Sequence, residues 1–376
     1  MGFSEKEFNR YSRHFILPEI GVEGQQKLKD SKILVVGAGG LGSPILLYLA
    51  AAGVGDIGII DDDVIEESNL QRQVLFTTED LQRPKAVVAS ERIKNLNPHI
   101  IVSPLATRLS SKNALEIIDF YDIVIDGTDN FPTRYLVNDA SVLLDKVNIY
   151  GSIFRFEGQV SVFNLARKDG MRGPNYRDLF PAPPPPGMVP GCAEGGVLGV
   201  LPGIIGSMQA NEAVKIITSA GEVLDGKLLL FDALSMETRK INIKMTGAYK
   251  NISKLIDYEL FCNSRTHEEP IVKEITAKEY KKLLDAGEPH ILFDVREDWE
   301  RQIVNIGGRN ATTDEMTDTI KRIDDNQKVI VYCRSGKRSA SSIREINKRI
   351  PYDNIYNLKG GVLAWITDID NSLTRY

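Results

Sequence analysis

ILVVGAGGLGS, residues 33–43, is the stretch that decides the fold of this chain. It begins as an apolar, strand-like run and breaks into a group of glycines just before a helical pattern. Glycines at this point let backbone N–H groups and a helix N-terminus approach a phosphate closely. A second strand, DIGII, ends at Asp61, where a carboxylate can bind ribose hydroxyls. The stretch therefore predicts the first βαβ unit of a nucleotide-binding domain.

Length and composition indicate a globular chain of two or three domains. It has 376 residues, and 42% of them are apolar. The net charge of -5 includes no basic stripe, so binding to nucleic acid or an anionic membrane is not expected. No apolar run approaches the roughly 20 residues of a membrane helix, and we expect a cytoplasmic protein. Its three cysteines cannot form a disulfide framework and suit a reducing compartment.

Strand and helix patterns alternate up to about residue 150, which favours a mostly parallel, Rossmann-like sheet with helices on both faces. From residue 147 the pattern changes to hairpin-like pairs, which we expect to add antiparallel strands to the same sheet. The sequence thus predicts an α/β domain over residues 1–245.

A second, smaller α/β domain is predicted over residues 271–376. Residues 246–270 carry no clear period and no long apolar run, which is typical of an interdomain linker. The spacing of Thr276 and Glu279 predicts a capping box at the start of the second domain's first helix.

The segments downstream of the glycines suit polyphosphate chemistry. Arg72 lies in SNLQRQ, Lys85 ends RPK, and DGTDN contains Asp126 and Asp129. Cations neutralise phosphate charge and a carboxylate can bind Mg²⁺, whereas hydride transfer usually needs a proton donor such as histidine. The set favours ATP over a dinucleotide, although each cation alone also fits a solvated surface charge.

Taken in order, GAGGLG, SNLQRQ, RPK and TDN resemble the MoeB/ThiF family of adenylyltransferases, relatives of ubiquitin-activating enzymes. The resemblance covers nearly all of residues 5–245, including CAEGGVLGVLPGIIGSMQANEAVK at 192–215. It implies that ATP adenylates the C-terminal Gly-Gly carboxylate of a small ubiquitin-like sulfur carrier, releasing pyrophosphate. The implied ATP site consists of Gly40, Asp61, Ser68, Asn69, Leu70, Gln71, Arg72, Lys85, Asp129 and Asn130.

Adenylation brings two anions together, because a carboxylate must approach a triphosphate. Arg13, Arg72, Lys85 and Mg²⁺ held at Asp129 are expected to neutralise this charge in the transition state. Joining the carboxylate to AMP supplies a good leaving group for the next step. No general base is required. In the family, the arginine matching Arg72 reaches into the site of the partner protomer, which implies a homodimer.

The resemblance also implies a structural zinc, held in most MoeB-type sequences by two CxxC pairs. This chain has Asn175 and Asp178 at the first pair, and the second pair is absent. Three dispersed cysteines cannot make a tetrathiolate site, so we expect no zinc.

CRSGKRS, residues 333–339, is the second chemistry-bearing motif. It follows the strand-like KVIVY and precedes a helical segment, so backbone N–H groups and a helix N-terminus can converge on the Cys333 sulfur. Arg334, Lys337 and Arg338 add positive charge. These surroundings stabilise an anion on the sulfur.

With DVREDWE at 294–300 and GGVLAW at 360–365, this motif resembles a rhodanese domain, which carries sulfane sulfur as a cysteine persulfide. Cysteine-dependent phosphatases place five residues between their cysteine and arginine, whereas Cys333 and Arg338 are separated by four. The shorter loop suits one sulfur atom better than a phosphate.

The two resemblances together imply one cycle, in which sulfur from a Cys333 persulfide displaces AMP and ends as a C-terminal thiocarboxylate. Cys192 follows a proline-rich segment, and the matching cysteine of the family forms a covalent link to the carrier; the alternative is a small apolar residue at a helix start. Cys262 is expected to be buried and inert. An NAD-dependent oxidoreductase and a non-catalytic carrier-binding scaffold stay open, as do the carrier's pathway and the sulfur donor, thiosulfate or a cysteine desulfurase.

Overall fold

The computed structural model describes residues 2–184, 195–263, 272–324 and 326–376. The chain forms two compact units, Met1–Arg265 and Thr266–Tyr376. Residues 246–263 therefore differ from the expected linker, because helix α11 (Tyr258–Asn263) packs on the first unit. Tyr258 and Cys262 supply its buried side chains, an i, i+4 pair too short to show as a sequence period.

An eight-stranded sheet organises the first unit, in the order β3-β2-β1-β4-β5-β6-β7-β8. The strands are β1 Lys32–Val36, β2 Asp56–Ile60, β3 Ile101–Leu105, β4 Ile123–Asp126, β5 Val147–Phe154, β6 Glu157–Phe163, β7 Lys227–Asp232 and β8 Thr238–Asn242. Strands β1 to β5 pair in parallel, and β5 to β8 pair antiparallel. The predicted mostly parallel, Rossmann-like sheet with added hairpins is confirmed.

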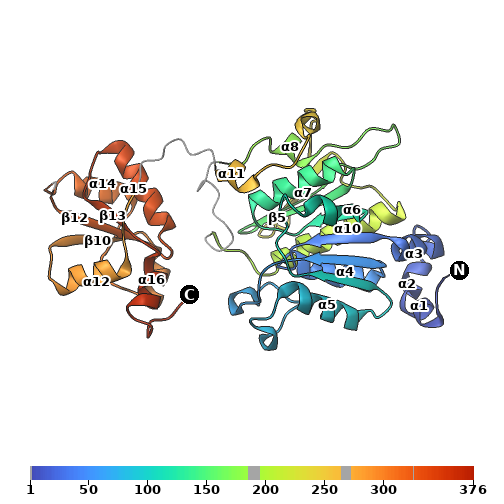
Figure 1. Ribbon diagram of the computed structural model, residues 1–376, viewed down its shortest axis with the longest axis horizontal. Helices are drawn as coiled ribbons and strands as arrows, with labels where there is room; N and C mark the ends of the chain where they lie inside the picture. The colour runs from blue at the N-terminus through green and yellow to red at the C-terminus, as the bar shows by residue number, and fades with distance from the viewer. Residues whose placement is uncertain (1, 185–194, 264–271, 325) are drawn as a thin grey trace. The chain divides into compact units, whose positions relative to one another are not determined.

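Helices cover both faces of this sheet (Figure 1). Ile33 and Val35 of β1 pack toward α4 (Gly42–Ala52), α5 (Lys85–Leu96) and α10 (Leu201–Thr218). Leu34 and Val36 pack toward α6 (Ala114–Asp119), α7 (Phe131–Leu143) and α11. Side chains alternate along a strand, so the unbroken apolar run of β1 fills both cores. The other helices of the unit include α1 Glu5–Arg10, α2 Ser12–Phe15, α3 Gly21–Asp30 and α8 Tyr176–Leu179.

A hydrogen-bonded carboxylate stands where the resemblance places zinc ligands. Asp178 on α8 accepts hydrogen bonds from the backbone N–H and the side-chain amide of Asn175 at 2.9 and 2.8 Å. It also accepts from the backbone N–H and the hydroxyl of Thr246 at 2.7 and 2.6 Å. These bonds fasten α8 to the segment after β8. The groups present do not fit a tetrathiolate zinc site.

We expect Asp178→Ala to lower the free energy of unfolding by about 2–3 kcal/mol, because its buried donors would lose their acceptor. Urea denaturation measures the change. Asp119→Ala is the matched control, since that carboxylate is 70% exposed, and should stay within about 0.5 kcal/mol of the parent. A chelator should leave the melting temperature unchanged; one zinc per chain by elemental analysis would contradict this account.

A five-stranded parallel sheet, in the order β11-β10-β12-β13-β9, organises the second unit. Its strands are β9 Lys273–Ile275, β10 His290–Asp294, β11 Arg309–Asn310, β12 Lys328–Tyr332 and β13 Ile355–Leu358. Helices α12 (Ala277–Asp285) and α16 (Gly361–Asp368) pack on one face, and α14 (Thr313–Ile320) and α15 (Lys337–Arg349) on the other. The predicted smaller α/β fold is confirmed, as is the capping box of Thr276 and Glu279.

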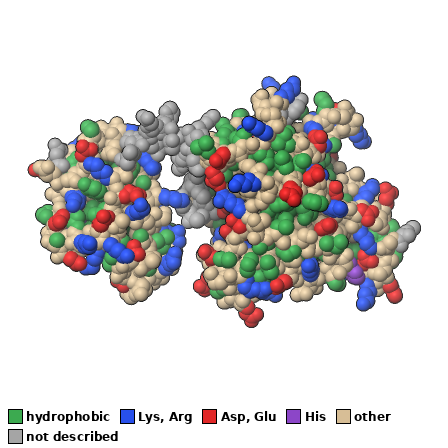
Figure 2. Space-filling view, in the orientation of Figure 1, with side chains coloured by type: hydrophobic (Ala, Val, Ile, Leu, Met, Phe, Trp, Pro, Cys, Tyr) green, Lys and Arg blue, Asp and Glu red, His purple; other side chains and the backbone are tan. Residues whose placement is uncertain are grey.

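The surface carries both signs of charge. On the face shown in Figure 2, Lys and Arg side chains are interspersed with Asp and Glu side chains on both units. Among the described residues, no helix is long and apolar enough to cross a membrane.

Candidate functional site

The first unit has a pocket of about 390 Å³ at the carboxyl edge of its parallel strands. It lies beside the β1–β4 pair, where the strand order reverses and where open α/β sheets bind ligands. Its volume falls within the roughly 300–1,000 Å³ of small-molecule sites. The predicted nucleotide-site residues that line it are Gly40, Asp61, Arg72, Lys85, Asp129 and Asn130.

The glycine loop is packed too tightly for side chains at two points. Gly37 has φ of +91°, a conformation that favours glycine. A Cβ at Gly42 would lie 2.0 Å from the Gly37 carbonyl oxygen. The compact turn also lets the Ala38 N–H donate to the Asp61 carboxylate at 2.8 Å, while burial raises the pKa of that carboxyl group. Asp61 is thereby fixed at the end of β2, as a ribose-binding role requires.

Two of the predicted cations, Arg72 and Lys85, line this pocket. Lys85, the first residue of α5, is 5% exposed and its Nζ lies 2.8 Å from the Asp63 carboxylate. The Arg72 guanidinium donates to the Ser68 carbonyl at 3.0 Å. Arg72 lines the pocket of its own protomer. The reach into a partner protomer's site that the resemblance implies stays a prediction.

Five other predicted site residues do not line the pocket. Arg13 is exposed on α2. Ser68 and Asn69 lie in a 3₁₀ turn, Glu67–Asn69. Leu70 and Gln71 follow this turn and precede Arg72, which lines the pocket. Their expected phosphate contacts stay a prediction.

Sequence reasoning missed several lining residues, including Gln73, Arg108 and Arg134. Arg134 is 8% exposed and donates to the Thr128 carbonyl at 3.0 Å, but its Nε has no hydrogen-bond partner among the described residues. Arg134 follows Asn130 by one helical turn, and Arg108 follows β3 at the carboxyl edge of the sheet. Both positions could have been inferred from those spacings.

Asp126, by contrast, has a structural role. Its carboxylate accepts hydrogen bonds from the Thr128 N–H at 2.9 Å and the Thr128 hydroxyl at 2.6 Å, and burial raises its pKa. Asp126 thus shapes the turn that presents Asp129, which is exposed on the pocket wall.

The loop after β12 encloses Cys333 in the second unit. The Gly336 N–H donates to the Cys333 Sγ at 3.1 Å, and the Ser339 hydroxyl lies 3.5 Å from the same atom. Helix α15 begins at Lys337, so its N-terminus adjoins the sulfur. The expected convergence of backbone donor and helix N-terminus on this cysteine is present, with Cys333 only 1% exposed.

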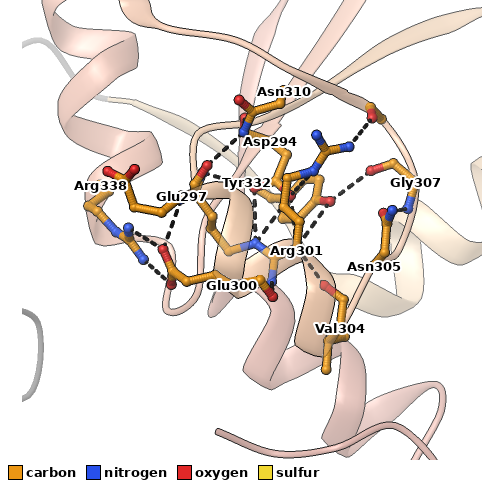
Figure 3. Close-up of polar contacts among 12 residues, drawn as sticks. Asp294, Glu297, Glu300, Arg301, Val304, Asn305, Gly307, Asn310, Tyr332 and Arg338 are labelled. Carbon is orange, nitrogen blue, oxygen red and sulfur yellow. Dashed lines mark hydrogen bonds and ion pairs between the residues drawn. The ribbon is translucent and has the colours of Figure 1, made fainter.

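Figure 3 shows Glu300 of the DVREDWE segment facing Arg338, which follows the Cys333 loop in the sequence. Arg296 and Asp294 form a fully buried ion pair at 2.7 Å. Glu300, on α13 (Asp298–Ile303), accepts two hydrogen bonds from the Arg338 guanidinium at 2.7 and 2.6 Å. Burial opposes ionisation of Glu300, but these bonds hold its pKa below the usual range. The Arg338 side chain is therefore held by hydrogen bonds to Glu300 on α13.

Of the other two cysteines, Cys262 is among the described residues. Cys192 lies outside the described residues. Cys262 is buried in the core of the first unit, where burial raises its pKa to about 11. This environment agrees with an inert thiol.

Cys262 should resist iodoacetamide at neutral pH, because only the thiolate reacts. Since its pKa is about 11, its alkylation should rise only as the pH approaches that value. Peptide mass analysis across a pH series measures this, with Cys333 as the internal comparison. Equal labelling of both cysteines at pH 6.5 in folded protein would contradict the prediction.

These two sites define a class of protein: a nucleotide-binding α/β unit with pocket cations, joined to a unit with a cysteine at a helix N-terminus. The ThiF family model matches residues 11–250, and the Rhodanese-like domain model matches residues 276–368. The chain belongs to the ThiF family and carries a C-terminal rhodanese-like domain. It is an adenylyltransferase and sulfurtransferase.

Individual proteins agree with this assignment. The probable adenylyltransferase/sulfurtransferase MoeZ of Mycobacterium tuberculosis is 45% identical, over 99% of this chain and 96% of its own length. The sulfur carrier protein adenylyltransferase of Thermus thermophilus is 52% identical, over 70% of this chain and 100% of its own. The crystal structure of E. coli MccB matches with a TM-score of 0.56 and 23% identity, over 65% of this chain and 72% of that one, which shows the fold alone.

Proposed function

We propose that this enzyme adenylates the C-terminal glycine of a ubiquitin-like sulfur-carrier protein and then converts it to a thiocarboxylate. The main support is that one chain contains both sites. These are a pocket lined by a buried lysine and a cysteine loop in which a backbone N–H donates a hydrogen bond to the sulfur. The named activity of the Thermus relative, sulfur carrier protein adenylyltransferase, supports this substrate class.

In the first step, the glycine loop, Arg72 and Lys85 hold the triphosphate of ATP. The carrier carboxylate attacks the α-phosphorus, a carboxyl–phosphate bond forms, and pyrophosphate leaves. Lys85 is suited to this because its partner Asp63 is 68% exposed, so an incoming phosphate can replace a solvated carboxylate. The oxygens of Asp129 and Asn130 fit Mg²⁺, which would neutralise charge on the departing pyrophosphate.

In the second step, the Cys333 thiolate takes the sulfane sulfur of a donor such as thiosulfate, and sulfite leaves. The terminal persulfide sulfur attacks the acyl-adenylate and releases AMP, giving an acyl disulfide. A second thiol then attacks the Cys333 sulfur and releases the thiocarboxylate. Cys192 is the candidate in this chain, and an external thiol must reduce the disulfide left behind. We further propose that the enzyme acts as a homodimer without zinc.

Carrier-dependent ATP–pyrophosphate exchange tests the first step in the purified protein. The proposal requires exchange only when the carrier ends in Gly-Gly. A change in NADH absorbance without carrier would favour the oxidoreductase, and carrier binding with no exchange would favour a scaffold. Either result would overturn the proposal.

A further inference from the structure

Tyr376 contacts the Cys333 loop at Arg334 and also contacts Arg296 and Glu300. Its backbone oxygen accepts a hydrogen bond from Arg334 Nε at 2.6 Å, and its ring centroid lies 5.5 Å from Arg334 Cζ. Its hydroxyl accepts from Arg296 Nη1 at 2.7 Å and donates to a Glu300 carboxylate oxygen at 3.3 Å. One residue thus joins the first arginine of the loop to the network of α13.

We propose that Tyr376 is a positioning residue that aims Arg334 at an anionic sulfur donor, of which thiosulfate is the simplest example. This inference rests on the proposed role of Cys333. Arg334 directly follows Cys333 in the same loop, and Tyr376 contacts its guanidinium. With one edge and one face of the guanidinium held by Tyr376, the opposite edge has a defined direction.

The chemistry needs such a charge, because a thiolate and a donor dianion repel each other as they approach. An unrestrained arginine samples many rotamers, and fixing it in advance lowers the entropy lost when the donor binds. Arg338, the other arginine near the sulfur, is already committed to Glu300. Arg334 is the loop arginine that Tyr376 contacts.

The Tyr376 hydroxyl also connects Arg334 to Arg338 through Glu300. It bonds to Glu300, and Glu300 holds Arg338, so Arg334, Tyr376, Glu300 and Arg338 form a continuous chain of contacts around the cysteine motif. The ring also packs edge-on against Trp299, with centroids 6.3 Å apart. These contacts orient the tyrosine independently of Arg334.

The experiment compares anionic iodoacetate with neutral iodoacetamide at Cys333 in the full chain, by peptide mass analysis. The ratio of the two rates reports the positive charge aimed at incoming anions. In Tyr376→Ala the ratio should fall about threefold to tenfold, and the KM for thiosulfate should rise by a similar factor with kcat less affected. Both variants keep the backbone oxygen that accepts from Arg334, but only Tyr376→Phe keeps the ring, so it should retain more of the parental ratio than Tyr376→Ala does.

Tyr356→Ala is the matched control, because its ring lies over Lys328, 6.0 Å away, instead of a loop arginine. It should keep the parental ratio. An unchanged ratio in Tyr376→Ala, or a loss in Tyr376→Phe as large as in Tyr376→Ala, would overturn the inference. The alkylation ratio does not require Cys333 to carry sulfur, so failure of this inference is distinguishable from failure of the proposed function, which Cys333→Ala tests.

Discussion

Cys333→Ala should lower thiosulfate:cyanide sulfurtransferase activity at least about a thousandfold while carrier-dependent ATP–pyrophosphate exchange continues at the parental rate. The reason is the division of labour proposed here. The Cys333 Sγ accepts a hydrogen bond from the Gly336 N–H in the second unit, whereas the described residues that line the nucleotide pocket belong to the first unit. Removing the sulfur leaves every lining residue of that pocket in place.

Cys262→Ala is the control for this prediction, since its thiol is buried and its pKa is raised to about 11. It should retain both activities. Parental sulfurtransferase activity in Cys333→Ala would show that the second unit does not carry the sulfur. Loss of pyrophosphate exchange in the same variant would contradict the separation of the two steps.

Asp129→Ala should have the opposite effect. We expect carrier-dependent ATP–pyrophosphate exchange to fall about a hundredfold to a thousandfold, because the pocket would lose a carboxylate that fits Mg²⁺ at the departing pyrophosphate. Thiosulfate:cyanide activity should remain, because Asp129 lies on the first unit and Cys333 on the second.

Asp119→Ala provides the matched carboxylate deletion outside the pocket, in the same unit. It should exchange pyrophosphate like the parent. If Asp129→Ala does so too, Asp129 has no role at the metal, and the Asp61 carboxylate, itself held by Ala38, would be the next candidate for removal.

The fold could be predicted because its signals are local. The strand KILVV, the glycines after it and Asp61 at the end of the next strand determine one βαβ unit without reference to the rest of the chain. KVIVY followed by CRSGKRS does the same for the second unit, where Val329 and Val331 face one core and Ile330 and Tyr332 face the other.

The site was only partly predictable, because a motif fixes a segment and not the direction of each side chain. SNLQRQ was expected to contribute several phosphate contacts, yet only Arg72 and Gln73 of that segment line the pocket. The 3₁₀ turn directs the preceding side chains elsewhere. Arg134 was missed although its spacing after Asn130 places it on the pocket side of α7, because its contact with Tyr150 is visible only in the structure.

Long-range polar contacts were similarly invisible in the sequence. The bonds from Thr246 to Asp178 join segments 68 residues apart, and those from Tyr376 to Glu300 join segments 76 apart. No periodicity encodes such pairs. The missing zinc ligands were evident from composition, but the hydrogen bonds in their place required the structure.

The most direct test of the central claim follows one sulfur atom. Full-length enzyme is given ATP, a Gly-Gly carrier, an external thiol, and thiosulfate with a heavy isotope at its sulfane sulfur, and the carrier C-terminus is analysed by mass spectrometry. The account predicts labelled thiocarboxylate with the parent, and acyl-adenylate without label with Cys333→Ala. Labelled thiocarboxylate formed at the parental rate by Cys333→Ala would contradict it.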